Sequence, residues 1–185
     1  FGHARGIVIN GTYAKQLDGE LILRFDDTDT SVKPPLLKAY QDIPKEAEWL
    51  LGFKPHRIII ASDRIDNYYS YSEQMLERGF GYVCTCSADE FRQLRIDKTE
   101  CKCRSQNENI NIELWEKMLD GSFKAGDAVV RVKTGMDLKN PALRDWPALR
   151  IQDTEKNPHP RKEIGSKYRV WPLLDFQSAV EDYLQ

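Results

Sequence analysis

Apolar residues recur along the first third of the chain with two different periods. Helical spacing is present in residues 4–17 and 34–51, and short apolar runs typical of buried strands occupy residues 21–25 and 58–60. Pro44 lies inside the second helical stretch, where a proline removes a backbone hydrogen bond, so we expect a break or kink there. The pattern predicts an alternation of strands and helices.

A third helix is predicted at residues 67–78, with Ser62 or Asp63 as its cap and Gly79 at its end. Strands that alternate with helices form parallel βαβ units, and ligands collect at the carboxyl ends of such strands. Asp26 and Asp63 both follow predicted strands. The amino-terminal part is therefore predicted to be an α/β unit with acidic side chains at its ligand-binding edge.

The pattern changes after residue 83. A cysteine-containing loop is followed by elements that form a smaller α+β module: a helix at 112–119 and strands at 128–133 and 148–151. Residues 153–167 are rich in Pro, Gly and Lys and are predicted to be an exposed loop. A strand at 168–171 and a helix at 175–184 then resume the α/β pattern. We interpret the middle module as an insertion.

Composition and charge narrow the class of protein. The 185 residues suffice for one ordinary domain or for two small ones that share a core, and the formal net charge is −2. That balance is not typical of a nucleic-acid-binding domain. Residues 124–171, however, carry 11 Lys+Arg against 6 Asp+Glu, which leaves 16 against 23 elsewhere. This basic segment is either a solvated face or a surface for phosphate groups.

Apolar runs are only a few residues long, so we expect no membrane-spanning helix and no membrane partner. The amino-terminal residues lack the pattern of a secretory signal. We therefore expect a cytoplasmic protein.

The four cysteines form two close pairs, Cys84 with Cys86 and Cys101 with Cys103. Without a secretory signal, we expect reduced thiols and not disulfides. Four thiolates are a typical ligand set for tetrahedral zinc and leave no open position on the metal, so we predict a structural zinc. Four ordinary reduced thiols remain the alternative, because adjacent extended side chains in a Cys-x-Cys pair point to opposite faces unless the backbone turns.

Several motifs, in order, resemble one enzyme family. GHARG at 2–6 is similar to the end of the HxGH motif of class I aminoacyl-tRNA synthetases, and LRFDDTD at 23–29 resembles the RFDDT motif of glutamyl- and glutaminyl-tRNA synthetases. Further similar segments are ASD at 61–63, GYVC at 81–84, RDWPALRI at 144–151 and YRVWPLLDF at 168–176. The resemblance covers nearly the whole chain and fits the archaeal type of glutamyl-tRNA synthetase best.

The resemblance implies a Rossmann-like class I catalytic domain, incomplete in this chain and interrupted by an α+β insertion that binds the tRNA acceptor end. It implies three parts: 1–82, the first half of the catalytic domain; 83–167, the zinc-containing insertion; and 168–185, the start of the second half. The implied reaction joins L-glutamate to tRNA(Glu) through a glutamyl-adenylate, with ATP and Mg as substrate and counter-ion. Positioning and phosphate stabilisation, rather than a covalent enzyme intermediate, carry such catalysis.

By the same resemblance, His3 and Gly2 act on the phosphates at the start of a helix, where free N–H groups already favour anions. The implied substrate-binding residues are Asp26, Arg24, Leu174 and Asp175. Asp26 would receive the ammonium of the amino acid through a charge-assisted hydrogen bond of about 1.5–3 kcal/mol.

Leu174 departs from the family, because many members have a tyrosine there whose hydroxyl orients the amino acid. We expect Asp29 to form a turn and leave the role of Asp27 open. The insertion's role and the basic segment together imply phosphate contacts at Arg144, Arg150, Arg161, Lys162 and Lys167.

Two alternatives stay open. Glutaminyl-tRNA synthetase shares the RFDDT motif but typically continues with Asn-Pro where this chain has Asp29-Thr30. A non-catalytic, zinc-stabilised tRNA-binding module is the other. The chain shows no KMSKS-type loop and no upstream arginine for the side-chain carboxylate, so we expect a fragment that is inactive in isolation.

Overall fold

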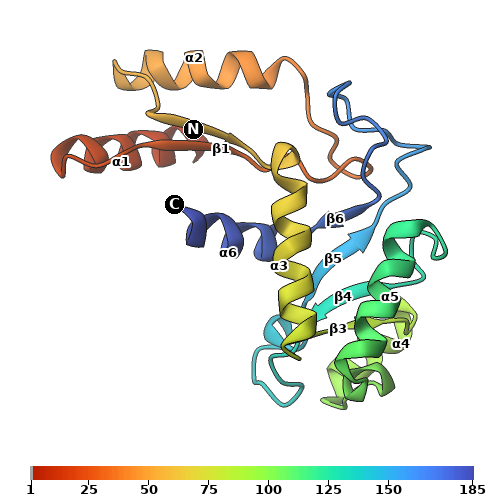
Figure 1. Cartoon of the computed structure of the whole chain (residues 1–185). Coiled ribbons are helices and arrows are strands. Elements are labelled where there is room, and N and C mark those ends of the chain that lie inside the picture. The colour runs from red at the N-terminus through yellow and green to blue at the C-terminus, as the bar shows by residue number, and fades with distance from the viewer. Residues whose placement is uncertain (1) are drawn as a thin grey trace.

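The computed structural model describes residues 2–185 (Figure 1). Its helices are α1 (Gly2–Gln16), α2 (Ala39–Leu51), α3 (Ile65–Glu77), α4 (Ala88–Asp97), α5 (Glu108–Asp120) and α6 (Leu174–Leu184). Its strands are β1 (Ile22–Phe25), β2 (Arg57–Ile60), β3 (Gly81–Cys84), β4 (Val129–Val132), β5 (Pro147–Ile151) and β6 (Val170–Pro172). Three short 3-10 helices are η1 (Ala61–Arg64), η2 (Lys102–Ser105) and η3 (Pro141–Leu143).

The first part of the chain forms a parallel βαβ unit, as the alternating pattern predicted. β1 and β2 pair in parallel, with Ile22 opposite Arg57 and Phe25 opposite Ile60. Helices α1 and α2 pack against each other beside this pair (Figure 1). Gly11 permits their close approach, because an added Cβ there would lie 2.5 Å from a methyl carbon of Leu51.

Two local expectations for this part are wrong: the start of α2 and the cap of α3. α2 begins at Ala39 rather than near residue 34, and at Pro44 the helix continues without a break. Neither Ser62 nor Asp63 caps α3, because both lie in η1 and the residue before the helix, Arg64, makes no side-chain cap. Both side chains instead bind groups from distant parts of the chain.

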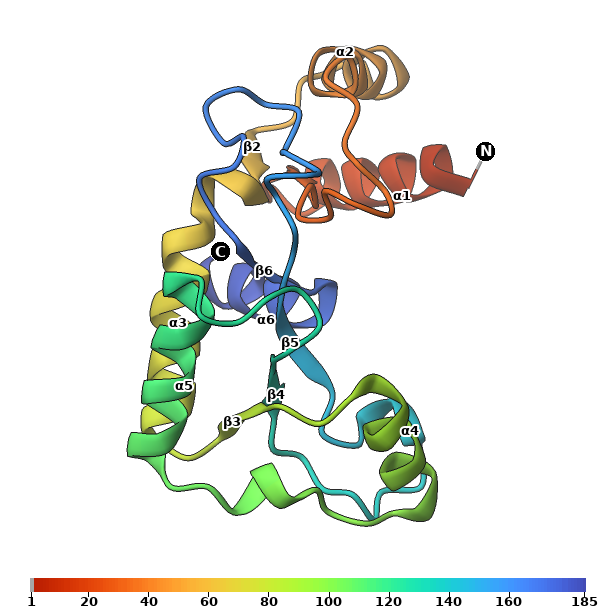
Figure 2. The same ribbon diagram turned by 90° about the vertical axis from the view of Figure 1, so that its right-hand side faces the viewer.

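The second part is an antiparallel sheet in the order β3-β4-β5-β6. α3, α5 and α6 pack on it and enclose the larger apolar core (Figure 2). Fully buried core side chains include those of Tyr68, Trp115, Leu149 and Trp171. The sheet crosses both boundaries expected at 82/83 and 167/168, because β3 contains the first and β6 joins β5 beyond the second. The division into three parts stays a prediction.

Two features of the middle segment differ from expectation. Helix α4 lies between the cysteine pairs, where we expected only a loop, and the Ser87 side chain caps it by accepting from the Glu90 N–H at 3.2 Å. Residues 153–167 contain no helix or strand, as expected, but Thr154, His159 and Ile164 within them are buried. This loop is therefore partly packed into the protein.

Among the helices of residues 2–185, none is long and apolar enough to cross a membrane.

Candidate functional site

The segment that follows β1, residues 26–30, begins with an acidic side chain at a strand end. Asp26 Oδ1 accepts from Arg24 Nε at 2.8 Å and from Gln177 Nε2. The Asp26 side chain is 35% exposed, and with Arg24 it lines an open cavity of about 550 Å³. A partly exposed carboxylate in this position can accept a cationic group of a ligand.

Asp27, whose role the sequence left open, is a buried hydrogen-bonding centre. Its carboxylate accepts from the Tyr40 hydroxyl at 2.6 Å and from the Ser62 N–H and hydroxyl at 2.8 and 2.7 Å. Burial alone would raise the pKa of the Asp27 carboxyl, but hydrogen bonds from His159, Tyr40 and Ser62 outweigh it and hold the pKa below its ordinary value. Asp27 therefore connects β1 to α2 and η1 as a carboxylate.

His159 brings the loop of residues 153–167 to the same place. Its Nδ1 accepts from the Arg161 N–H at 3.2 Å, so the hydrogen-bond pattern assigns the proton to Nε2, which lies 3.0 Å from the Asp27 carbonyl oxygen and 3.4 Å from the carboxylate. The imidazole also stacks on Trp171 of β6, with 5.7 Å between ring centroids. The loop is thus fixed onto the end of β1.

Two buried glutamines hold the rest of the segment. Gln152, after β5, donates to the Thr28 carbonyl at 2.8 Å and accepts from the Thr30 N–H and hydroxyl. Gln177 of α6 accepts from the Thr28 hydroxyl at 2.9 Å and donates to Asp26. Asp29 accepts from two following backbone N–H groups, which agrees with its expected role in a turn.

The remaining residues implied for catalysis and substrate binding are exposed. His3 lies in the first turn of α1, and with Gly2 it lines a cavity of about 610 Å³ that also borders β1 and α2. Leu174 and Asp175 lie in the first turn of α6, where Leu174 is 58% exposed. His3 and Asp26 line different cavities in this structure.

Arg144 differs from the expectation that it contacts tRNA phosphates. It is 5% exposed, and its guanidinium donates to the carbonyl oxygens of Leu138, Arg95 and Lys139. All of its nitrogens are therefore used inside the protein. Arg144 is a structural residue of this fold and not a surface contact.

The other four basic candidates fall into two groups. The Arg161 side chain is 13% exposed, lies 2.8 Å from both Asp63 and Glu163, and donates to Ser62, so its charge is already compensated. Lys162 and Lys167 are exposed. Arg150 is partly exposed and lies 3.4 Å from Asp29. Lys162, Lys167 and Arg150 thus keep the access that a phosphate contact needs.

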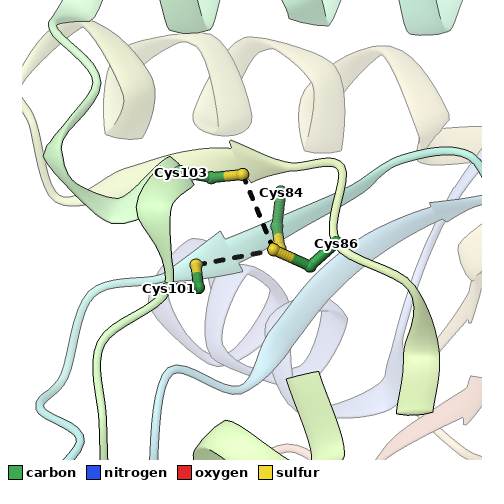
Figure 3. Close-up of side chains that lie close together, drawn as sticks. All are labelled: Cys84, Cys86, Cys101 and Cys103. Carbon is green, nitrogen blue, oxygen red and sulfur yellow. Dashed lines mark hydrogen bonds between the residues drawn. The ribbon is translucent and has the colours of Figure 1, made fainter. Parts of the chain in front are cut away.

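The four cysteines come together, as their spacing predicted. Cys84 ends β3, Cys103 lies in η2, and the sulfur ends of all four side chains point toward one another (Figure 3). The Sγ atoms lie within 4.8 Å of one another, with 4.0 Å between Cys84 and Cys101 and 3.9 Å between Cys86 and Cys103. All four are free and buried.

The environment of the cluster acts on the acidity of its thiols in both directions. Burial, with the neighbouring sulfurs, raises the pKa of the Cys86 thiol, whereas the hydrogen bond with Cys84 lowers the pKa of the Cys101 thiol. Four thiolates at this spacing would repel one another strongly. A cation among them would remove that repulsion.

Asp145 is linked to the cysteine cluster through the side chain of Tyr82. Its carboxylate is fully buried and accepts from Tyr82 at 3.0 Å, from Arg104 at 2.8 Å and from two backbone N–H groups. The Tyr82 hydroxyl in turn lies 3.6 Å from Cys101 Sγ. Such partners behind the ligating atoms fix the orientation of a metal site.

Sequence reasoning did not assign roles to His159, Gln152, Gln177 or Asp145. His159, Gln152 and Gln177 are buried polar side chains with partners far away in the sequence, so no local pattern could have indicated their roles. Asp145 alone carried a local signal, because the aspartate lies within the motif RDWPALRI.

Comparisons with known proteins agree with this fold. The family model of the class I tRNA synthetases for glutamate and glutamine (E and Q), catalytic domain, matches residues 1–185. The chain therefore belongs to this family of class I aminoacyl-tRNA synthetases, which confirms the resemblance that the motifs indicated.

Curated relatives of this chain include archaeal glutamate–tRNA ligases. The chain is 51% identical to the glutamate–tRNA ligase of Pyrococcus furiosus over 182 residues, which are 98% of this chain and 31% of the relative. It is 49% identical to that of Nanoarchaeum equitans over 183 residues, 99% of this chain and 32% of the relative. The chain thus spans about a third of the length of the curated relatives it matches.

A solved structure shares the fold. The glutamate tRNA ligase from Elizabethkingia meningosepticum, in complex with its amino acid, matches 97% of this chain and 38% of its own with a TM-score of 0.60 and 18% identity. The predicted class I catalytic fold is therefore confirmed.

Proposed function

We propose that the protein containing this chain joins L-glutamate to tRNA(Glu), with ATP as co-substrate and glutamyl-adenylate as the intermediate. The identity of about one half to archaeal glutamate–tRNA ligases over 98% of the chain is the observation that carries the proposal. The partly exposed Asp26 at the end of β1 supports it, because this carboxylate can bind the ammonium of an amino acid.

The residues of the chain supply binding and orientation. Asp26 holds the substrate ammonium, and the buried network around Asp27 keeps the loop of residues 153–167 in place. His3, in the first turn of α1, donates to the phosphates of ATP, which arrives with Mg. No protein group becomes covalently attached. Catalysis then depends on placing the glutamate carboxylate in line with the α-phosphate.

We also propose a structural zinc at the four cysteines. A tetrahedral zinc with Zn–S near about 2.3 Å separates its sulfurs by about 3.8 Å. The observed 3.9 and 4.0 Å separations fit that geometry. Four thiolates leave no position for a substrate, so the ion stabilises the fold of residues 84–103. Reduced thiols also favour the cytoplasm as the compartment.

The tRNA acceptor end is proposed to contact the exposed basic residues of the loop and sheet, namely Lys162, Lys167 and Arg150. Arg144 leaves the proposed set because its guanidinium is bound inside the protein, and Arg161 leaves it because its charge is compensated by Asp63 and Glu163.

Aminoacylation of tRNA(Glu) by the complete reading frame tests the proposal. We expect labelled glutamate, and not glutamine, to become acid-precipitable with tRNA in the presence of ATP. Charging of tRNA(Gln) with glutamine alone would favour the glutaminyl alternative. Binding of tRNA without charging by either amino acid would favour the non-catalytic module.

A further inference from the structure

The amide of Gln177 has only one orientation that satisfies its neighbours. The side chain is fully buried, and its Oε1 accepts from the Thr28 hydroxyl at 2.9 Å. Because the Asp26 carboxylate can only accept, the end of the amide that faces it must be Nε2, which donates to Asp26 Oδ1. The Thr28 hydroxyl then donates to Oε1 and holds the amide in this orientation.

The two carboxylate oxygens of Asp26 have different hydrogen-bond partners. Within residues 2–185, the hydrogen bonds from Arg24 and Gln177 both fall on Oδ1, and none falls on Oδ2. The carboxylate also lines the open cavity with Arg24. One oxygen is therefore held by protein donors, while the other is left for a ligand.

Gln152 offers a close comparison. It is also a buried glutamine from the second half of the chain, and it binds the same segment at the Thr28 carbonyl and at Thr30. It makes no hydrogen bond to Asp26 in the described part of the chain. Gln152 thus holds only the segment at Thr28 and Thr30, whereas Gln177 also contacts the Asp26 carboxylate.

We propose that Gln177 is a positioning residue of the amino-acid site, which orients Asp26 so that Oδ2 accepts the ammonium of glutamate. The proposal rests on the proposed function and adds to it a residue from α6. Because the ammonium bond requires a fixed carboxylate, loss of the amide weakens glutamate binding. ATP binding does not depend on Oδ2.

The test uses the complete reading frame and initial rates of tRNA(Glu) charging. Gln177→Met keeps the length of the side chain and removes the donor. We expect it to raise the KM for glutamate about 5- to 20-fold, with kcat within about threefold and the KM for ATP within about twofold. Gln152→Met is the matched control. Its glutamate KM should stay within about twofold of wild type even if its melting temperature falls as far as that of Gln177→Met.

A second pair protects the test if Gln177→Met does not fold. Thr28→Val removes the hydroxyl that holds the Oε1 end of the amide and should raise the glutamate KM about 2- to 5-fold, whereas Thr28→Ser keeps the hydroxyl and should keep the wild-type value. Equal glutamate KM changes in Gln177→Met and Gln152→Met would overturn the proposal, and so would an unchanged KM in Thr28→Val. A wild-type enzyme that charges no glutamate would overturn the proposed function itself.

Discussion

Replacing Asp27 should cost more stability than replacing either acidic neighbour in its segment. In Asp27→Ala, the N–H and hydroxyl of the fully buried Ser62 lose their acceptor, and so does the Tyr40 hydroxyl. A buried donor left without a partner costs about 1–3 kcal/mol. The two donors of Ser62 alone therefore give a loss of about 2–6 kcal/mol in the free energy of unfolding.

Urea unfolding at pH 7, followed by tryptophan fluorescence, measures this loss. Trp171 stacks on His159, which itself binds Asp27, so the probe reports on the affected region. Asp29→Ala is the control, because the hydrogen bonds of Asp29 come only from two residues that closely follow it and its ion pair with Arg150, at 3.4 Å, is partly exposed, so the change should cost at most about 1.5 kcal/mol. A loss below about 1 kcal/mol in Asp27→Ala, or one equal to the control, would refute the reasoning.

The pH dependence of the same variant follows from the lowered pKa of Asp27. Because the folded state holds the carboxylate more strongly than the unfolded state does, its contribution is complete above the unfolded pKa of about 3.9. It is lost as the pH falls through the lower folded pKa. The difference in unfolding free energy between wild type and Asp27→Asn should therefore shrink below about pH 4. A difference that is constant from pH 7 to pH 3 would show that the carboxylate charge does not matter.

Three further outcomes are expected. Asp26→Ala should raise the glutamate KM, or lower kcat/KM, by about 10- to 150-fold with little change for ATP, and wild-type glutamate kinetics would show that Asp26 is only a turn residue. The double change of Lys162 and Lys167 to Ala should make the slope of log affinity for tRNA against log salt shallower by about one to two, whereas Arg161→Ala should lower the melting temperature and leave that slope unchanged. Elemental analysis should find about one zinc per chain, and Cys101→Ser should lose both the zinc and stability. Less than about a tenth of an equivalent in wild type, with Cys101→Ser as stable as wild type, would contradict the zinc site.

The parts of the fold that could be predicted are those with a local signal. Apolar runs placed β1 and β2, and Gly79 ended α3, where its φ is +71°. The short spacing within each cysteine pair predicted a cluster that the fold then assembled across 17 residues. The sequence also contains a signal for helix α4, because Ser87 and Glu90 have the spacing of a capping box. Our expectation of a loop between the cysteine pairs did not use that signal.

Other features depend on long-range packing. Arg161 and Arg144 looked like phosphate contacts because each is a basic residue in a basic segment, yet both are bound to distant or carbonyl partners. Thr28 and Gln177 lie 149 residues apart in the sequence and are joined by a buried hydrogen bond. Spacing along the chain carries no information about such pairs.

Exchange of labelled pyrophosphate into ATP by the complete reading frame, with tRNA(Glu) present, tests the central claim most directly. Formation of glutamyl-adenylate is reversible and returns label to ATP only when the enzyme activates the added amino acid. We expect exchange with glutamate at least about tenfold faster than with glutamine or with no amino acid, and a matching loss in Asp26→Ala at low glutamate. Exchange that is absent with glutamate, or equally fast with glutamine, would contradict the account.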